Sequence, residues 1–178
     1  MATKTGKVFL LRHERRKNSI AFESSLTPRG LKNAKEVVCP QLEQLNIGSI
    51  YCSPFIRTLQ TIAPFCQKTG KKVNIEWSLV ESYPSKPKIP EEFASIINTN
   101  YNSFISYKYP ENYDIITFEL LKQRAKTFIE SLDRTKNVLL VTHMPVINAV
   151  LSYKGFEFIE MYTHHHPGSL LSMSGEGI

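Results

Sequence analysis

The chain has few cysteines for its 178 residues, and their spacing is irregular. Cys39, Cys52 and Cys66 are too few for a disulfide framework and too far apart for a zinc ribbon, and one of the three must stay unpaired. We therefore expect reduced thiols, as in a cytoplasmic protein, with Cys52 as a small buried packing residue.

Long hydrophobic runs are absent too. No uninterrupted apolar stretch approaches the roughly 18 to 20 residues that span a bilayer. Near the N-terminus the apolar run Val8–Leu11 meets a charge cluster after only four residues, too few for the apolar region of a secretory signal. We expect neither membrane insertion nor secretion by a cleaved signal, and hence a cytoplasmic location.

The sequence also lacks internal repeats and long low-complexity tracts. At about 150 residues per domain, the length argues for a single domain over 1–178. One stretch, about 82–114, differs from the rest, since it begins with several prolines, is rich in tyrosine and shows little periodicity. We interpret it as an insertion or cap, partly helical around 91–97, that overhangs the site.

The charge balance is basic, with 22 Lys and Arg against 16 Asp and Glu, a net charge of +6. This number alone does not separate a nucleic acid, an anionic membrane surface and a small anionic substrate as partners. The sequence has no recognisable nucleic-acid motif and no basic stripe interleaved with aromatic residues. We therefore expect a small anionic substrate, with neither nucleic acid nor membrane as partner; the oligomeric state stays open.

Short apolar runs typical of strands buried on both faces alternate with helical patterns. The strands are expected over Val8–Leu11, Ile50–Cys52, Val73–Ile75, Val138–Val141 and, last, Ser169–Met173. The helices are expected over about 28–47, 54–69 and 116–132. Leu31 lies on the apolar face of the first helix, and Pro64 predicts a kink or an early stop in the second.

This alternation predicts an α/β fold, a three-layer α/β/α sandwich with a mainly parallel central sheet. Such sheets place their functional sites at the carboxyl ends of the strands. The residues that follow the runs are therefore the candidates for the site: Arg12, His13, Ser53, Arg57, Glu81, Thr142 and His143.

Five motifs stand in one order along the chain. They are Arg12-His13, the LTPRG segment Leu26–Gly30, the SPFIRTLQT segment Ser53–Thr61, Glu81 within Leu-Val-Glu, and Val-Thr-His ending at His143. In this order they resemble the histidine phosphatase superfamily, which includes phosphoglycerate mutases and many phosphomonoesterases. The resemblance runs from Val8 to about Ser174, and it implies a phosphoglycerate mutase-like fold and a phosphatase that needs no metal and no cofactor.

Binding a phosphoryl group requires cations, because its negative oxygens repel an approaching nucleophile. Guanidinium groups neutralise that charge through paired hydrogen bonds, and Arg12 and Arg57 are suited to this. Arg16 stands where one phosphatase branch has the pattern RHxER, so it is either a further phosphate ligand or a solvated charge.

The resemblance implies the remaining roles. His13 is the candidate nucleophile, since neutral imidazole is competent near neutral pH. His143 would donate a hydrogen bond to the transferring phosphoryl group, or else serve only in packing. Glu81 would protonate the leaving oxygen and later accept a proton from water, although Glu76 is close by in the sequence.

Two alternatives to a hydrolase stay open. Glu14 stands where the family has glycine, which favours a catalytically weak module that binds phosphorylated ligands. A phosphoglycerate mutase-type phosphotransferase is the other alternative to a phosphomonoester hydrolase. The run His164, His165 and His166 is either an exposed loop or the source of one histidine that touches substrate.

Overall fold

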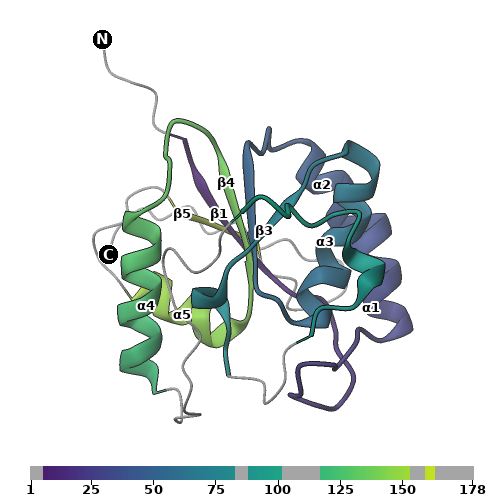
Figure 1. Ribbon diagram of the computed structural model, residues 1–178, viewed down its shortest axis with the longest axis horizontal. Helices are drawn as coiled ribbons and strands as arrows, with labels where there is room; N and C mark the ends of the chain where they lie inside the picture. Colours follow the sequence, from purple (N-terminus) through teal and green to yellow (C-terminus); the bar gives the residue numbers. More distant parts are fainter. Residues whose placement is uncertain (1–5, 83–87, 102–116, 153–158, 163–178) are drawn as a thin grey trace.

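A parallel five-stranded sheet forms the centre of the protein (Figure 1). The computed structural model describes residues 6–82, 88–101, 117–152 and 159–162. The strand order is β3-β2-β4-β1-β5, so the connections β1 to β2, β3 to β4 and β4 to β5 each pass one intervening strand. The strands are β1 (Val8–Arg12), β2 (Ser49–Cys52), β3 (Val73–Ile75), β4 (Val138–Thr142) and β5 (Ile159–Tyr162).

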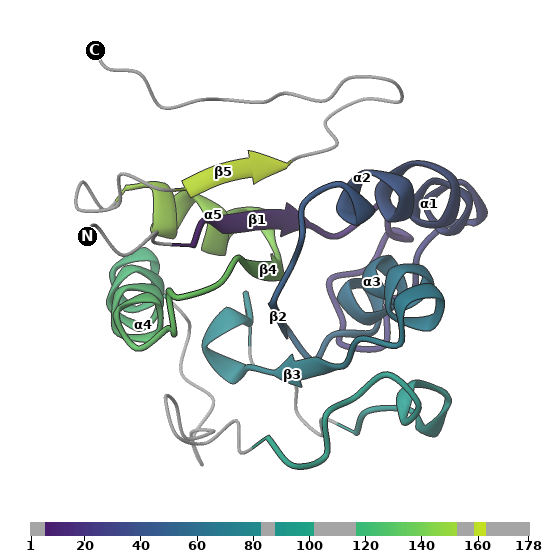
Figure 2. The ribbon, with the colours of Figure 1, turned by 90° about the horizontal axis from the view of Figure 1, so that it is seen from above.

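Helices cover both faces of this sheet, as the view from above shows (Figure 2). On one face lie α1 (Pro28–Asn33), α2 (Cys39–Glu43) and α3 (Ile56–Thr69), and on the other lie α4 (Phe118–Glu130) and α5 (Met144–Leu151). Successive side chains of a strand point to opposite faces, and in β1 Phe9 and Leu11 join the first helix layer while Val8 and Leu10 join the second. The predicted three-layer α/β/α sandwich is confirmed.

The first predicted helix is built from three segments. A π-helical turn, η1 (Ala34–Val38), separates α1 from α2, and Pro40 follows directly in the first turn of α2. Proline offers no N–H to the carbonyl four residues earlier, and here the wider turn is closed by Cys39 N–H donating to Ala34 O. The expectation that Leu31 is buried was wrong: its exposed fraction is 44%.

The helix α3 runs through Pro64 without stopping there, so the predicted early stop was wrong. It ends at Gly70, whose φ of +71° is the left-handed conformation that terminates helices and that glycine adopts without strain. The side chains of Leu59, Ile62 and Phe65 on its buried face contribute to the core. Packing therefore holds the helix together despite the proline.

Two elements were not predicted, α5 and β5, while the strand expected over Ser169–Met173 lies outside the described residues. Within the stretch 82–114 the structure describes residue 82 and residues 88–101. The latter include one 3₁₀ turn, η3 (Glu91–Phe93). This segment lies along the sheet edge, where Asn98 N–H donates to Val73 O at 2.8 Å. Whether the remainder of the stretch overhangs the site therefore stays a prediction.

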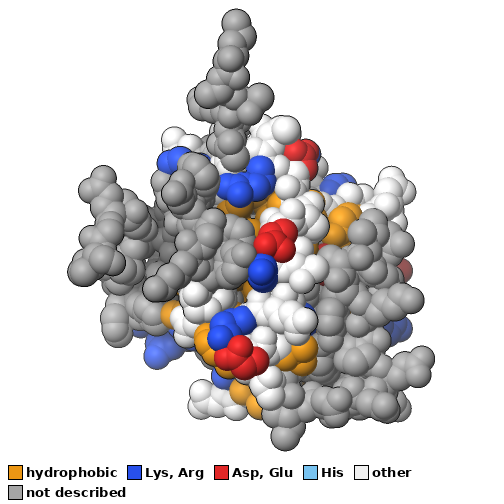
Figure 3. Space-filling model, turned by 90° about the vertical axis from the view of Figure 1, so that its left-hand side faces the viewer, with side chains coloured by type: hydrophobic (Ala, Val, Ile, Leu, Met, Phe, Trp, Pro, Cys, Tyr) orange, Lys and Arg blue, Asp and Glu red, His pale blue; other side chains and the backbone are white. Residues whose placement is uncertain are grey.

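The outer surface of α4 carries charges of both signs (Figure 3). Lys122 pairs with Glu119 at 2.6 Å and Lys126 with Glu130 at 4.0 Å.

No helix in the described ranges combines the length and the apolar character needed to cross a bilayer.

Candidate active site

His13 follows β1 directly, and two backbone contacts fix its place. Its N–H donates to Thr142 O of β4 at 3.0 Å, which continues the pairing of β1 with β4 beyond the strand end. Its ring Nδ1 lies 2.7 Å from Glu14 O. A carbonyl oxygen only accepts, so Nδ1 carries the ring proton and Nε2 keeps a lone pair.

Arg57 lies in the first turn of α3, and its side chain is fully buried, with an exposed fraction of 0%. The guanidinium lies over the ring of Phe55, 4.4 Å from its centroid, and donates from Nη1 to Ala21 O at 2.8 Å. Its Nη2 donates to Glu81 Oε1. The buried cation is thus held by aromatic, carbonyl and carboxylate groups together.

His143 is the residue before α5, and it is completely buried. Its ring centroid lies 5.3 Å from that of His13. Nε2 is 2.9 Å from Ser53 Oγ, and Nδ1 is 3.4 Å from Glu81 Oε1 and makes no hydrogen bond with any of the described residues. The hydroxyl of Ser53 can donate to Nε2 or accept from it, according to the tautomer of His143; in the tautomer in which Ser53 donates, the ring proton lies on Nδ1, on the side of Glu81.

The structure separates the two candidate carboxylates. Glu81 touches both Arg57 and His143, and its side chain is 18% exposed. Glu76 is fully buried and caps the 3₁₀ helix η2 (Trp77–Leu79), where it accepts from Ser78 N–H at 2.9 Å. Glu81 is therefore the carboxylate that the fold brings to the two predicted site residues.

The other two predicted arginines lie in the same region. Arg12 ends β1, is half-buried, and its charge helps to lower the pKa of both His13 and His143. Arg16 is half-buried and donates from Nη1 to Ser19 O at 2.6 Å and to Lys17 O at 3.0 Å. Arg16 thus braces its own loop, and its role as a phosphate ligand stays a prediction.

Burial sets the protonation of the two histidines. It is the main reason that the pKa of His13 is lowered to about 4, helped by the positive charges of Arg57, Arg12 and Arg16 and opposed by the hydrogen bond to Glu14 O. Burial lowers the pKa of His143 well below its usual range, and the nearby cations act in the same direction. Both rings are neutral at neutral pH.

Glu14 occupies its position without backbone strain. Among the described residues other than glycine, only Asn46 has a positive φ, so this site does not require glycine for its conformation. The contacts that matter for His13 come from the Glu14 backbone: its carbonyl accepts from His13, and its N–H donates to Thr61 Oγ1 at 3.0 Å.

The helix α3 also holds the loop that follows His13. Thr61 Oγ1 donates to Arg57 O at 2.7 Å while it accepts from Glu14 N–H, so it ties the histidine loop to the helix that carries the arginine. Gln60 Oε1 accepts from Leu26 N–H at 2.7 Å. Gln60 and Thr61 thus support the site through three specific hydrogen bonds.

Three more side chains bond to the site or to the segment that leads to Glu81; the sequence named Ser53 and Thr142 as candidates by position, without a role, and Arg124 was not among them. Ser53 binds His143, Thr142 donates to Leu79 O at 2.7 Å, and Arg124 of α4 donates to Val80 O at 2.7 Å. One signal for Arg124 was present, because it is a charged residue within the apolar stripe of its helix, next to Ala125 and one turn before Phe128.

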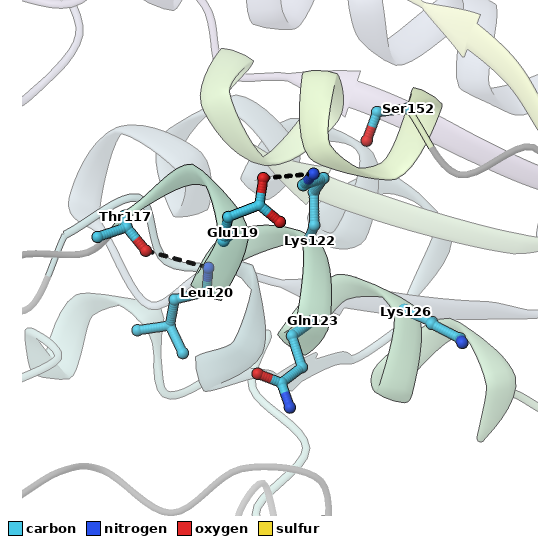
Figure 4. Close-up of a pocket in the computed structure, with 7 residues that line it drawn as sticks. All are labelled: Thr117, Glu119, Leu120, Lys122, Gln123, Lys126 and Ser152. Carbon is cyan, nitrogen blue, oxygen red and sulfur yellow. Dashed lines mark hydrogen bonds and ion pairs between the residues drawn. The ribbon is translucent and has the colours of Figure 1, made fainter.

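The surroundings of the site hold little else that is reactive. The three cysteines are free and buried, and burial raises the pKa of the Cys66 thiol to about 12. Over the described ranges, no three His, Cys, Asp or Glu side chains are grouped so that they could hold a metal ion. A surface hollow beside α4, lined by Glu119, Lys122 and Ser152 among others, lies apart from the histidines (Figure 4). His164, His165 and His166 fall outside the described residues.

Comparison with known sequences gives one family. Residues 8–175 match the sequence model of the histidine phosphatase superfamily, branch 1. No curated protein sequence matches the chain.

Solved structures with the same fold include several phosphatases. An ecdysone phosphate phosphatase from Bombix mori, in complex with tungstate, is 15% identical with a TM-score of 0.63, covering 94% of this chain and 85% of its own. YhfR from Bacillus stearothermophilus is 20% identical with a TM-score of 0.60 and covers 83% and 78%. A phosphoserine phosphatase from Entamoeba histolytica, in complex with 3-phosphoglyceric acid, is 22% identical with a TM-score of 0.57 and covers 82% and 78%.

Proposed function

The chain belongs to the histidine phosphatase superfamily, and from this premise we propose that it is a phosphomonoester hydrolase that forms a phosphohistidine intermediate on a small or protein-borne phosphate. One observation carries the proposal: His13, His143, Arg57 and Glu81 meet at the carboxyl ends of the parallel strands, two neutral imidazoles beside a buried cation and a carboxylate. These groups match the needs of phosphoryl transfer, in which positioning and charge stabilisation supply most of the rate.

In the first step the Nε2 lone pair of His13 forms a bond to phosphorus while the bond to the leaving oxygen breaks. The hydrogen bond from Nδ1 to Glu14 O supports this assignment, because it leaves Nε2 unprotonated. A phosphoryl oxygen takes the place of the Glu81 carboxylate on Arg57, and Arg12 and His143 Nδ1 donate to the remaining oxygens. Glu81, now freed from Arg57, takes up a proton from the phosphate monoanion of the incoming substrate and passes it to the leaving oxygen.

In the second step water attacks the phosphohistidine. The water proton passes to the Glu81 carboxylate as the new oxygen–phosphorus bond forms and the nitrogen–phosphorus bond breaks. His13 returns to its neutral form and inorganic phosphate leaves, which completes a cycle that balances without a metal ion. In a mutase, a second substrate hydroxyl would replace the water.

The test measures phosphate release from sugar phosphates, nucleotides, phosphopeptides and aryl phosphates. His13→Ala should lower the turnover by about 10³-fold or more, because it removes the only group that bonds to phosphorus. The control is Lys68→Ala, which removes one positive charge from an exposed position on α3 and should leave the rate unchanged.

The other two functions give distinct results in the same experiment. Full activity of His13→Ala on an aryl phosphate would overturn the proposal. Conversion of 3-phosphoglycerate to 2-phosphoglycerate without phosphate release would identify a mutase. Phosphate binding without turnover, together with no acid-labile labelled phosphoenzyme, would identify a binding module.

A further inference from the structure

Glu81 lies outside every helix and strand, two residues beyond η2, so no regular backbone pattern holds its carboxylate in place. A general acid must nevertheless stay within hydrogen-bond distance of the leaving oxygen. The two residues that precede it, Leu79 and Val80, are fully buried. In the free protein the carboxylate is also held by Arg57. Once a phosphoryl oxygen takes its place on Arg57, the position of Glu81 depends on what holds these two residues.

Each of the two preceding carbonyls accepts a hydrogen bond from a buried side chain of a different element. Thr142 Oγ1 of β4 donates to Leu79 O at 2.7 Å, and Arg124 Nη2 of α4 donates to Val80 O at 2.7 Å. Thr142 and Arg124 have exposed fractions of 0% and 5%. Water therefore has little access to replace either donor.

Thr142 also contacts the rest of the site through its backbone. Its carbonyl accepts from His13 N–H at 3.0 Å, and its peptide continues directly into His143. One residue thus connects the nucleophile, the second histidine and the segment that leads to the acid. The hydroxyl is the part of Thr142 that bonds the segment leading to Glu81, through Leu79 O, because the other two connections use only the backbone.

We propose that Thr142 and Arg124 are positioning residues that clamp the carbonyls of Leu79 and Val80 and thereby hold Glu81 where it protonates the leaving group. This inference rests on the proposed function and adds to it two residues that do not touch the substrate. Loss of these two hydrogen bonds should therefore impair only the part of catalysis that depends on Glu81.

The test uses the basicity of the leaving group as its readout. We would measure kcat/KM, which reports the first phosphoryl transfer, with para-nitrophenyl phosphate, whose leaving group needs little protonation, and with phenyl phosphate and an alkyl phosphate, whose leaving groups need more. Thr142→Val keeps the branched shape and loses the hydroxyl. We expect a loss of about ten- to hundredfold on the basic leaving groups, as for a small misplacement of a catalytic group, and little loss on para-nitrophenyl phosphate.

Two variants separate this role from a general effect on folding. Thr142→Ser keeps the donor and should restore kcat/KM on all substrates to within about threefold of wild type. Thr69→Val is the matched control, because it removes a hydroxyl that donates to Phe65 O at 2.7 Å near the far end of α3, and it should change no substrate selectively.

A double-mutant cycle tests whether Thr142 acts through Glu81. In the Glu81→Gln background, Thr142→Val should have no further effect on kcat/KM, since the group that it positions is gone. Equal losses on every leaving group, or the same loss in both backgrounds, would overturn the clamp. Should Thr142→Val fail to fold, Arg124→Met is measured in the same way and decides by the same criteria.

The two proposals fail in different ways. A wild-type protein that releases phosphate from no substrate overturns both the hydrolase and the clamp. An active wild type with an inactive His13→Ala variant, together with a Thr142→Val variant that shows no leaving-group dependence, overturns the clamp alone.

Discussion

His13 and His143 are imidazoles 5.3 Å apart that share a site with a buried guanidinium. In water two such rings would be partly protonated near pH 6.5, but here burial and the neighbouring arginines disfavour a further positive charge. In the proposed mechanism the same arginines would bind the phosphate and, together with burial, keep the proposed nucleophile His13 neutral. Phosphate binding and nucleophilicity would in this way be two effects of one charge arrangement.

This arrangement makes stability depend on pH. The pKa of His13 falls from 6.5 to about 4 on folding, so between these values the unfolded chain binds more protons and the free energy of unfolding decreases as the pH falls. Because the unfolded imidazole is only half protonated at pH 6.5 and the slope approaches 1.36 kcal/mol per pH unit only below it, His13 should cost about 1.6 kcal/mol between pH 6.5 and pH 5. Urea unfolding of wild type and His13→Ala at the two pH values should show that the variant loses about 1.6 kcal/mol less.

Lys68→Ala is the control for that measurement, because this exposed residue does not titrate in the window and should follow wild type. The lowered pKa of His143 also makes the free energy of unfolding decrease as the pH falls, and it does so in all three proteins. Only the difference between the proteins in this pH-dependent loss therefore reports on His13. Identical slopes for wild type and His13→Ala would show that His13 is not held neutral by the fold.

At the scale of single residues, the sequence predicted those site residues that belong to a motif. It did not predict residues whose part in the site depends only on their contacts in the fold. The position after each predicted strand led to His13, Arg57 and His143, and the fold brings all three together. Glu81 and Glu76 were both candidates because their difference lies in which way each side chain turns. Arg124 was missed since its partner is a backbone carbonyl 44 residues away.

At the scale of elements, the LTPRG segment explains how a helix supports the loop after His13. Thr27 N–H donates to Arg15 O at 2.8 Å, and its hydroxyl accepts from Gly30 N–H as it caps α1. Gly30 packs so closely that an added Cβ would lie 2.5 Å from Arg15 O. Glycine is therefore required here by close approach of two backbone segments.

Gly30→Ala tests this contact. The methyl group must push the Arg15 segment away, and we expect a loss of about 1 to 3 kcal/mol in the free energy of unfolding, as for other overpacked sites. Because the displaced segment leads back to Glu14 and His13, kcat/KM should fall as well. Denaturant unfolding and phosphatase assays on the same preparation measure both effects.

Gly70→Ala provides the comparison, because it costs about 1 kcal/mol through its left-handed backbone while nothing lies within 4 Å of the added carbon. This variant should lose stability and keep its activity. Equal activity of the two glycine variants would show that the Gly30 contact does not support the site.

Helices and strands were predictable where the hydrophobic pattern and the residues that begin or end an element agree, as for four strands and for the start of the helix at Pro28. The π-helical turn before Pro40 and the continuation of α3 through Pro64 were not predictable, because each is decided by how the proline fits the packing around it. The strand β5 pairs with β1 across a long separation in sequence, and such pairing leaves no local pattern.

At the scale of the whole molecule, the net charge of +6 is less informative than the location of the charges. On α4, lysines are paired with glutamates, so the face in Figure 3 carries no continuous basic stripe among its described residues. Arg12, Arg16 and Arg57, by contrast, lie within electrostatic reach of the same histidine. This distribution favours a small anion over a nucleic acid as the ligand of the basic residues.

Ligand-induced stabilisation tests this distribution on the intact protein. Inorganic phosphate at 100 times its Kd should stabilise the fold by about 2.7 kcal/mol, which corresponds to a rise in Tm of about 5 to 10 °C for a chain of this size. Arg12→Gln should remove most of the shift by weakening phosphate binding, whereas Lys68→Ala, with the same loss of net charge, should keep it. Melts at matched ionic strength with duplex DNA in place of phosphate should show no shift. A DNA-induced shift that survives Arg12→Gln and falls steeply with salt would instead place the functional charge outside this site.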